Sequence, residues 1–362
     1  MRGSYTPHMA IATEPIGSIP RPLELVEAIR GFQEGCVSHE KLDALHADAL
    51  RDTIRSFKET GSPVITDGEQ TKPSFATYPI QGLANVAPDG IAVPFADGHT
   101  RRLPRLTFGP FCYKTHAETF FKAAREHTQL PLKQAVISAS LLSLLYPQEG
   151  IKSYSRELFI ENLVREAVAD VRGCLDLGAY KVQIDFTEAR LSIKLDSSGR
   201  LLQQFVDLNN QVLGNFTDKE QSKIGVHTCP GGDWDTTHSA DVDYAGLLPA
   251  LFSLNAGNFY IQLASEKDRR RVLQLIAEHS RPCQTIFVGV IDPINPRVET
   301  PEEVCDRVLE AAEFIPLDRL GTTDDCGFAP FSDDTSTARN TAFAKIRARV
   351  EGTGLAATAL GA

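Results

Sequence analysis

Short apolar runs rich in β-branched residues recur along the chain, and each one ends at polar or turn-forming residues. Runs of this kind predict buried strands. Long amphipathic stretches separate them; residues 158–177, for example, carry apolar side chains at the i, i+3, i+4 and i+7 spacing of a helix. Thr300 and Pro301 predict the N-cap and first residue of another helix. The predicted strands are a segment ending at Gly17-Ser18 and residues 63–66, 134–137, 179–184, 222–226, 258–261, 285–291 and 320–323.

Strands that alternate with helices favour an α/β fold in which parallel strands are joined by helical crossovers. We therefore predict a single closed (β/α)8 barrel, the TIM barrel, with its chemistry at the carboxyl ends of the strands. Residues 91–108 alternate around Asp97-Gly98 and predict a β-hairpin inserted between two barrel units. The barrel is expected to occupy residues 11–352, with a leader or disordered segment at 1–10 and a flexible tail at 353–362.

The charge balance narrows the range of partners. The 362 residues include 37 Lys and Arg against 47 Asp and Glu, a net charge of −10, and no basic run. The sequence therefore lacks the basic patch that is typical of proteins that bind nucleic acid or an anionic membrane. No apolar stretch approaches the ~20 residues of a membrane span. Seven cysteines, an odd number without a signal peptide, indicate a reducing, cytoplasmic compartment rather than a disulfide framework.

The strongest local signal is His227-Thr228-Cys229, directly after the predicted strand 222–226. Residues two apart in a strand project to the same side, so this His and this Cys can reach one ion above the barrel mouth. Cys326 follows the last predicted strand, and barrel closure brings that strand end to the same face. Imidazole and thiolate are typical ligands of Zn²⁺. The alternative is a chance His-x-Cys pair and a Cys326 that is simply a buried apolar thiol.

Acidic residues also stand at or just beyond the predicted strand ends, where a charge faces a cleft rather than the core. Asp caps helix N-termini well, and this structural role is expected for about half of them. The turn at Gly17-Ser18 and Arg21 offers backbone N–H groups and a cation, which suits either a small carboxylate or the closing of a loop. The acidic residues are Asp67, Glu69, Asp185, Glu188, Asp292, Asp324 and Asp325.

Six short motifs follow one another in order over nearly the whole chain. They are Ile16-Gly17-Ser18-Ile19-Pro20, Asp67-Gly68-Glu69, Val182-Gln183-Ile184-Asp185, His227-Thr228-Cys229, Gly289-Val290-Ile291-Asp292 and Asp325-Cys326-Gly327. Taken together they resemble the catalytic domain of cobalamin-independent methionine synthase, in the superfamily that also contains uroporphyrinogen decarboxylase and the epoxyalkane coenzyme M transferases. The resemblance implies a (β/α)8 barrel that binds zinc through His227, Cys229 and Cys326.

The resemblance also implies a chemistry. In the family the metal binds the thiol of an acceptor and lowers its pKa, so that a thiolate attacks an electrophilic carbon; this agrees with the behaviour of thiols at Zn²⁺. The positions that match Glu69 and Asp185 hold the acceptor homocysteine, and backbone groups of the Ile-Gly-Ser turn complete its pocket. We therefore expect Glu69 and Asp185 as catalytic residues that position the thiol, with Ile16 and Ser18 also binding the substrate.

Several positions depart from the family pattern. Gln262 stands where methionine synthases have a Glu zinc ligand, so the fourth ligand is open between Gln262, Glu266, water and the substrate. Asp292-Pro293-Ile294-Asn295-Pro296 stands where the family has Asp-Ile-His-Ser-Pro, so the His that protonates folate is missing, and residues 137–142 lack the Trp that stacks on the pterin. The length leaves no room for the N-terminal second barrel of the full-length enzymes. We therefore expect the zinc and thiol half of the chemistry, with the use of folate left open.

The preferred function is zinc-dependent transfer of a methyl or alkyl group from a small donor to a small thiol. Addition of a thiol to an epoxide, as in the coenzyme M transferases, is one alternative. A metal-free decarboxylase of the uroporphyrinogen type is another, for which Arg21, Arg190 and Lys194 are too few cations. The alternative that is not an enzyme is a barrel that serves only as a binding or structural subunit. The long surface helices are compatible with a homo-oligomer.

Overall fold

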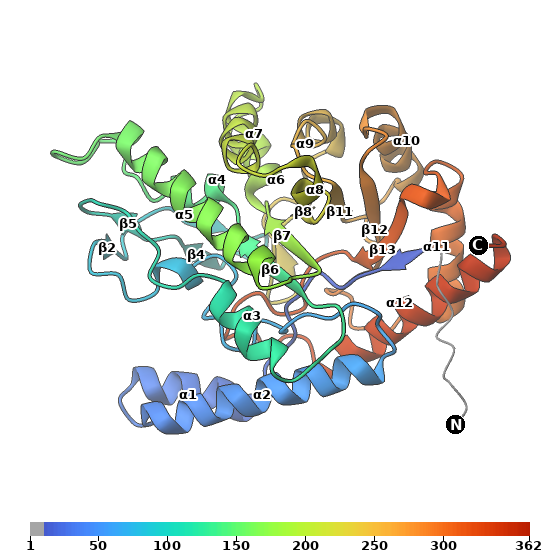
Figure 1. Ribbon diagram of the computed structural model, residues 1–362, viewed down its shortest axis with the longest axis horizontal. Coiled ribbons are helices and arrows are strands. Elements are labelled where there is room, and N and C mark those ends of the chain that lie inside the picture. Colours follow the sequence, from blue (N-terminus) through green and yellow to red (C-terminus); the bar gives the residue numbers. More distant parts are fainter. Residues whose placement is uncertain (1–10) are drawn as a thin grey trace.

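The computed structural model describes residues 11–362; the leader expected at residues 1–10 lies outside the described residues. Its centre is a parallel sheet of seven strands in the order β1-β13-β12-β11-β8-β7-β6, curled into a half-barrel with helices on its outer side (Figure 1). This is an α/β fold of the TIM-barrel type. The strands are β1 (Ala12–Thr13), β6 (Lys133–Ile137), β7 (Lys181–Asp185), β8 (Ile224–Thr228), β11 (Asn258–Ile261), β12 (Thr285–Ile291) and β13 (Leu320–Asp324).

Two of the eight predicted strands differ in the structure. The N-terminal strand lies earlier than expected, at Ala12–Thr13, and the segment 63–66 contributes one isolated bridge between Ile65 and Leu132. Between these edges the Ile19 N–H donates to the Gly68 carbonyl at 3.0 Å, and the Thr66 hydroxyl donates to the Gly17 carbonyl at 2.8 Å. Loop contacts therefore replace the backbone hydrogen bonds that were expected between two paired strands. The closure of an eight-stranded barrel stays a prediction.

The helices form where the apolar spacing predicts them. Helix α5 (Arg156–Asp176) begins after Ser155, whose hydroxyl accepts from the Leu158 N–H. Helix α11 (Pro301–Ala312) begins with the predicted Thr300 cap, completed by a capping box with Glu303. The other α-helices up to α10 are α1 (Leu23–Gln33), α2 (His39–Glu59), α3 (Glu118–Arg125), α4 (Ala139–Ser143), α6 (Glu188–Leu195), α7 (Arg200–Leu213), α8 (Asp218–Gln221), α9 (Leu248–Leu251) and α10 (Arg269–His279).

An antiparallel pair interrupts the chain before α3. Strands β3 (Ala92–Pro94) and β4 (Thr100–Arg102) pair around a turn in which Gly98 has a φ of 94°, a value that favours glycine. A second short pair, β2 (Val86–Ala87) and β5 (Arg105–Leu106), continues from its base. The Ala96 N–H donates to the Thr237 carbonyl, next to the small β9 (Gly232–Asp233) and β10 (Thr236–Thr237) pair. This insertion, residues 92–102, is called the hairpin below.

The expectation of a flexible tail from residue 353 is wrong for residues 353–359, because helix α12 (Arg339–Ala359) continues through them. Gly352 lies so close to α11 that a Cβ atom there would be 2.5 Å from the Pro301 carbonyl oxygen. The buried Arg349 of α12 binds Asp324 at 2.6 Å. Packing thus holds this last helix, although its sequence looked featureless. Within residues 11–362, no helix is long and apolar enough to cross a membrane.

Candidate metal centre and adjoining pocket

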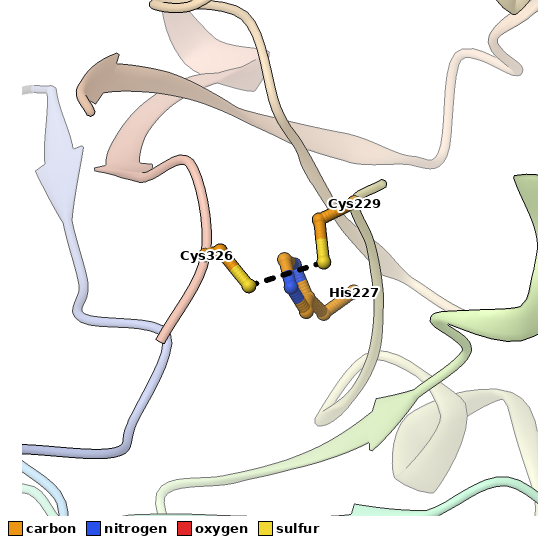
Figure 2. Close-up of side chains that lie close together, drawn as sticks. All are labelled: His227, Cys229 and Cys326. Carbon is orange, nitrogen blue, oxygen red and sulfur yellow. Dashed lines mark hydrogen bonds between the residues drawn. The ribbon is translucent and has the colours of Figure 1, made fainter. Parts of the chain in front are cut away.

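The carboxyl ends of two strands in the sheet bring three predicted ligands together. His227 and Cys229 stand at the carboxyl end of β8, and Cys326 stands just after β13, so the His and Cys of one strand face the Cys of the other (Figure 2). One ligand atom from each residue lies within 4.8 Å of the others, and the two Sγ atoms are 3.1 Å apart. His227 and Cys229 are buried, and Cys326 is partly buried.

The donor atoms fit a metal ion. Neither ring nitrogen of the buried His227 has a hydrogen-bond partner among residues 11–362, which is unusual for a buried imidazole. The hydrogen bond from the Cys229 thiol lowers the pKa of Cys326 well below its usual range, and His227 lowers it further. The pair is thus predisposed to hold one thiolate. A set of one imidazole and two sulfurs is what Zn²⁺ accepts in three-ligand sites that keep a fourth position open.

The loop that carries Cys326 is fixed by its neighbour Asp325. Both carboxylate oxygens of Asp325 accept backbone N–H groups from residues 263–265. Burial raises the pKa of Asp325 to about 7, while these bonds favour its charged form. Gly289 leaves the necessary room, because a Cβ atom there would be 1.9 Å from the Asp325 Oδ1. Asp325 therefore holds the loop that carries Cys326 in position.

Gln262 and Glu266, the side chains considered for the fourth ligand, are both engaged elsewhere. The Arg190 Nη1 donates to the Gln262 Oε1 at 2.8 Å and to the Glu266 Oε1 at 2.9 Å. The Gln262 amide also donates to Ser265. The Arg190 side chain is only 1% exposed, so these bonds are shielded from water. Of the four alternatives, water and the substrate are the ones that the geometry favours.

A pocket with a cavity volume of about 100 Å³ adjoins the cluster. This is below the roughly 300–1,000 Å³ of a typical ligand site, so the pocket suits a small ligand. Apolar side chains form most of its wall, including Val93 and Phe95 of the hairpin and Leu103 directly after it. The sequence predicted the hairpin but offered no signal that it covers this pocket. The predicted site residues that line the pocket are Ile16, Ser18, Glu69, Asp185, His227 and Cys326.

The two predicted catalytic carboxylates are buried in this pocket. Glu69 has a φ of 57°, and its Oε1 accepts from the Lys72 ammonium at 3.0 Å. Its Oε2 has no partner in the part of the chain that the structure describes. Burial raises the pKa of Glu69 to about 7, although Lys72 lowers it. Burial also raises the pKa of Asp185, whose Oδ1 accepts from the Gln183 amide at 2.8 Å.

The N-terminal turn is partly committed to the fold. The Ile16 N–H donates to Asp324 at 3.1 Å, so that amide is taken, while the Ser18 hydroxyl oxygen accepts from the Ala329 N–H at 3.3 Å. Arg21 donates to four backbone carbonyls, those of Glu69 and of Lys72, Ala329 and Phe331. The sequence left two roles open for this turn, binding a small carboxylate or closing a loop. The bonds of Arg21 close the loops.

Glu188 is a pocket residue that the sequence placed among the acids at strand ends that face a cleft, without assigning it a role of its own. It is 2% exposed, and burial raises its pKa to about 7. Its position two residues before Arg190 carries no signal of this environment, because the partners that enclose it come from distant segments.

Comparison with known proteins finds relatives among methionine synthases. A family model described as "Cobalamin-independent synthase, Catalytic domain" matches residues 231–350, a segment that contains Cys326. A methionine synthase of Sulfolobus acidocaldarius is 25% identical over 320 residues, covering 88% of this chain and 85% of the relative. A 5-methyltetrahydropteroyltriglutamate–homocysteine methyltransferase of Nitratidesulfovibrio vulgaris is 24% identical over 325 residues. The chain is thus similar to cobalamin-independent methionine synthases over most of its length.

Members of the methionine synthase family differ in length. The match covers 88% of this chain but spans only 38% of the N. vulgaris protein. Solved structures share the fold: a B12-independent methionine synthase from Shewanella sp. W3-18-1 in complex with selenomethionine has a TM-score of 0.76 at 21% identity, covering 97% of this chain and 98% of that one. A putative vitamin-B12 independent methionine synthase from Listeria monocytogenes has a TM-score of 0.69 at 22% identity, covering 95% and 98%.

Proposed function

We propose that this protein transfers a methyl or larger alkyl group to a small thiol, with zinc held by His227, Cys229 and Cys326. The observation that carries the proposal is a buried imidazole, without a hydrogen-bond partner among the described residues 11–362, beside two sulfurs 3.1 Å apart at the wall of a pocket. Zinc held there would supply the Lewis acidity that lowers the pKa of an acceptor thiol. The methyltransferase names of the relatives support the reaction class.

The chain's own residues would then bind and orient the acceptor. Glu69 and Asp185 lie in the pocket as carboxyl groups whose pKa burial has raised, so a cationic partner is what would restore their charge. An amino acid thiol such as homocysteine carries such an ammonium group. Ser18 would face its carboxylate, while Ile16 would contribute to the wall of the pocket. In this role Glu69 and Asp185 hold the thiol in line with the electrophile.

The same pocket bears on the donor. Phe95, Leu103 and other apolar side chains line it, and of its two lining arginines Arg101 is already bound to Asp233 and Asp333. A polyanionic folate tail would find one exposed arginine there, Arg102, within a mostly apolar wall. This favours a small, largely apolar donor, and it keeps addition of the thiol to an epoxide as the second candidate. Decarboxylation of a polycarboxylate finds no comparable support.

The test begins with the metal. Purified protein is expected to hold close to one equivalent of zinc, and Cys229→Ser is expected to lose most of it, together with thiol alkylation. Cys36→Ser, at an exposed site, is the matched control and should behave as the wild type. Homocysteine with methylfolate, methylcobalamin or S-methyl donors is compared with epoxide plus thiol. A Cys229→Ser protein with wild-type zinc content and turnover would refute the proposal.

A further inference from the structure

Glu188, the first residue of α6, is a buried acid that lines the same pocket as His227 and Cys326 but has no part in holding metal or acceptor. Its two oxygens differ. Oε1 accepts the hydroxyl groups of Ser138, at 2.7 Å, and of Ser140. Oε2 is buried and has no partner within residues 11–362. A buried carboxyl oxygen without a partner costs free energy unless a ligand or a proton satisfies it.

The hydrogen bonds that the two serine oxygens accept determine where their own hydroxyl protons point. The Ser138 oxygen accepts from the Leu141 N–H at 3.1 Å, and the Ser140 oxygen accepts from the Asn209 amide at 2.8 Å. The Ser140 N–H donates to the Asn209 Oδ1, which sets the orientation of that amide. Each serine therefore points its own proton at the Glu188 Oε1. An oxygen that already receives two donors is the carbonyl side of the acid, so a proton on Glu188 belongs on Oε2.

The surroundings keep that proton near neutral pH. Burial is the largest cause that raises the pKa of Glu188 to about 7, and Asp185, at the end of β7, raises it as well. The hydroxyl groups of Ser138 and Ser140 and the backbone at the start of α6 lower it. The opposing causes leave an acid that is substantially protonated at pH 7 and readily gives its proton up, as a general acid must.

We propose that Glu188 protonates the leaving atom of the alkyl donor from its Oε2, and that this atom is oxygen or nitrogen. The inference rests on the proposed function. The acceptor sulfur forms a bond to the alkyl carbon while the bond from that carbon to the leaving atom breaks. The leaving atom takes the bonding electron pair and the proton of Glu188, which becomes a carboxylate. The proton that the next thiol loses restores the acid, so thiol and donor give thioether and protonated leaving group.

The wall of the pocket explains why such an acid is useful. Phe75, Phe95, Leu103 and Leu141 line it, and apolar side chains solvate a departing alkoxide or amide anion poorly. A proton delivered as the bond breaks avoids that charge. A donor whose leaving group departs as a stable anion or as a neutral molecule needs no such help. The structure thus separates two classes of donor by their dependence on one residue.

The experiment compares Glu188→Gln with the wild type on two donors that share one alkyl group. One donor must release an alkoxide or an amine; the other, a sulfonate ester, releases a stable anion. Glutamine keeps an oxygen for the two serines but has no acidic proton. Its kcat is expected to fall by about 100- to 10,000-fold on the first donor and by less than about 3-fold on the second. Glu161→Gln, at an exposed position of α5, is the matched control.

An infrared difference spectrum tests the proton without turnover. Glu69 and Asp325 also have a pKa raised to about 7, so the spectrum of Glu188→Gln is subtracted from that of the wild type. The difference is expected to hold a protonated carboxyl band that titrates near pH 7. Equal losses on both donors, or none on either, would overturn the inference, as would the absence of that band. A wild type that alkylates no thiol with any donor refutes the proposed function instead, and the band still decides where the proton lies.

Discussion

The buried pair of Asp324 and Arg349 ties the last helix to the strand that precedes the ligand loop, and Arg349→Met is expected to cost about 3–5 kcal/mol of unfolding free energy. The side chains are 1% and 0% exposed, and the Arg349 Nη1 lies 2.6 Å from the Asp324 Oδ1. Opposite charges about 4 Å apart attract by about 4 kcal/mol at the effective dielectric of a protein. Arg349 also donates to the Glu14 carbonyl at 2.9 Å, and that bond is lost as well.

The cost should depend on pH. Burial already raises the pKa of Asp324, while Arg349 lowers it, so removing the arginine raises the folded-state value further. A folded state that binds more protons than the unfolded state loses stability as pH rises. The deficit of Arg349→Met relative to the wild type should therefore grow between pH 5 and pH 8, by up to about 1.4 kcal/mol per pH unit.

Urea denaturation followed by circular dichroism at several pH values measures both effects. The double variant Arg349→Met with Asp324→Asn is the matched control, because it removes the stranded charge and should flatten the pH dependence. A loss of unfolding free energy below about 1 kcal/mol that is independent of pH would contradict the reasoning. Water does not reach this pair, so it cannot compensate Asp324 for the lost arginine at so small a cost.

Three further predictions concern a cap, a carboxylate and the hairpin. Thr300→Ala should cost about 1 kcal/mol in urea denaturation by removing the α11 capping box, and an unchanged midpoint would contradict this. Lys72→Met removes the cation that lowers the pKa of Glu69, so the acidic limb of the pH profile of kcat/KM for the thiol should move up by about one unit; a downward shift would be inconsistent with Glu69 binding the acceptor. Arg101→Ala unties the hairpin from Asp233, so thermolysin should cut within residues 95–103 faster than in the wild type, whereas equal cleavage rates would argue against the clamp.

The strands could be predicted well because their composition leaves little choice. The run Thr285–Ile291 is almost entirely apolar and β-branched, and it became β12 with the predicted bounds. The segment 63–66 has the same composition, yet it makes one bridge, because the loops that follow Gly17 and Thr66 bond to each other instead. Composition indicates a strand; its neighbours decide how much of it pairs.

The candidate site divides in the same way. His227 and Cys326 could be placed together because strand ends of a parallel sheet meet on one face. The engagement of Gln262 by Arg190 could not be predicted, since it depends on how far one long side chain reaches across the barrel mouth. The proton on Glu188 likewise depends on hydroxyl groups 48 and 50 positions away in the chain. The apolar pattern of the sequence locates the ends of the strands. The charge states of the side chains there depend on contacts between segments that are far apart in the chain.

Strand β1 has consequences for the order in which the protein is made. Its partner in the sheet is β13, and the Ile16 N–H that follows β1 is bonded to Asp324, 308 positions later. At a synthesis rate of roughly 5–20 residues per second, the N-terminal strand waits roughly 15–60 s on the ribosome before its partner exists. During that time its backbone edge is unpaired and open to other chains. The newly made chain is therefore expected to need protection at its first strand until the last one emerges.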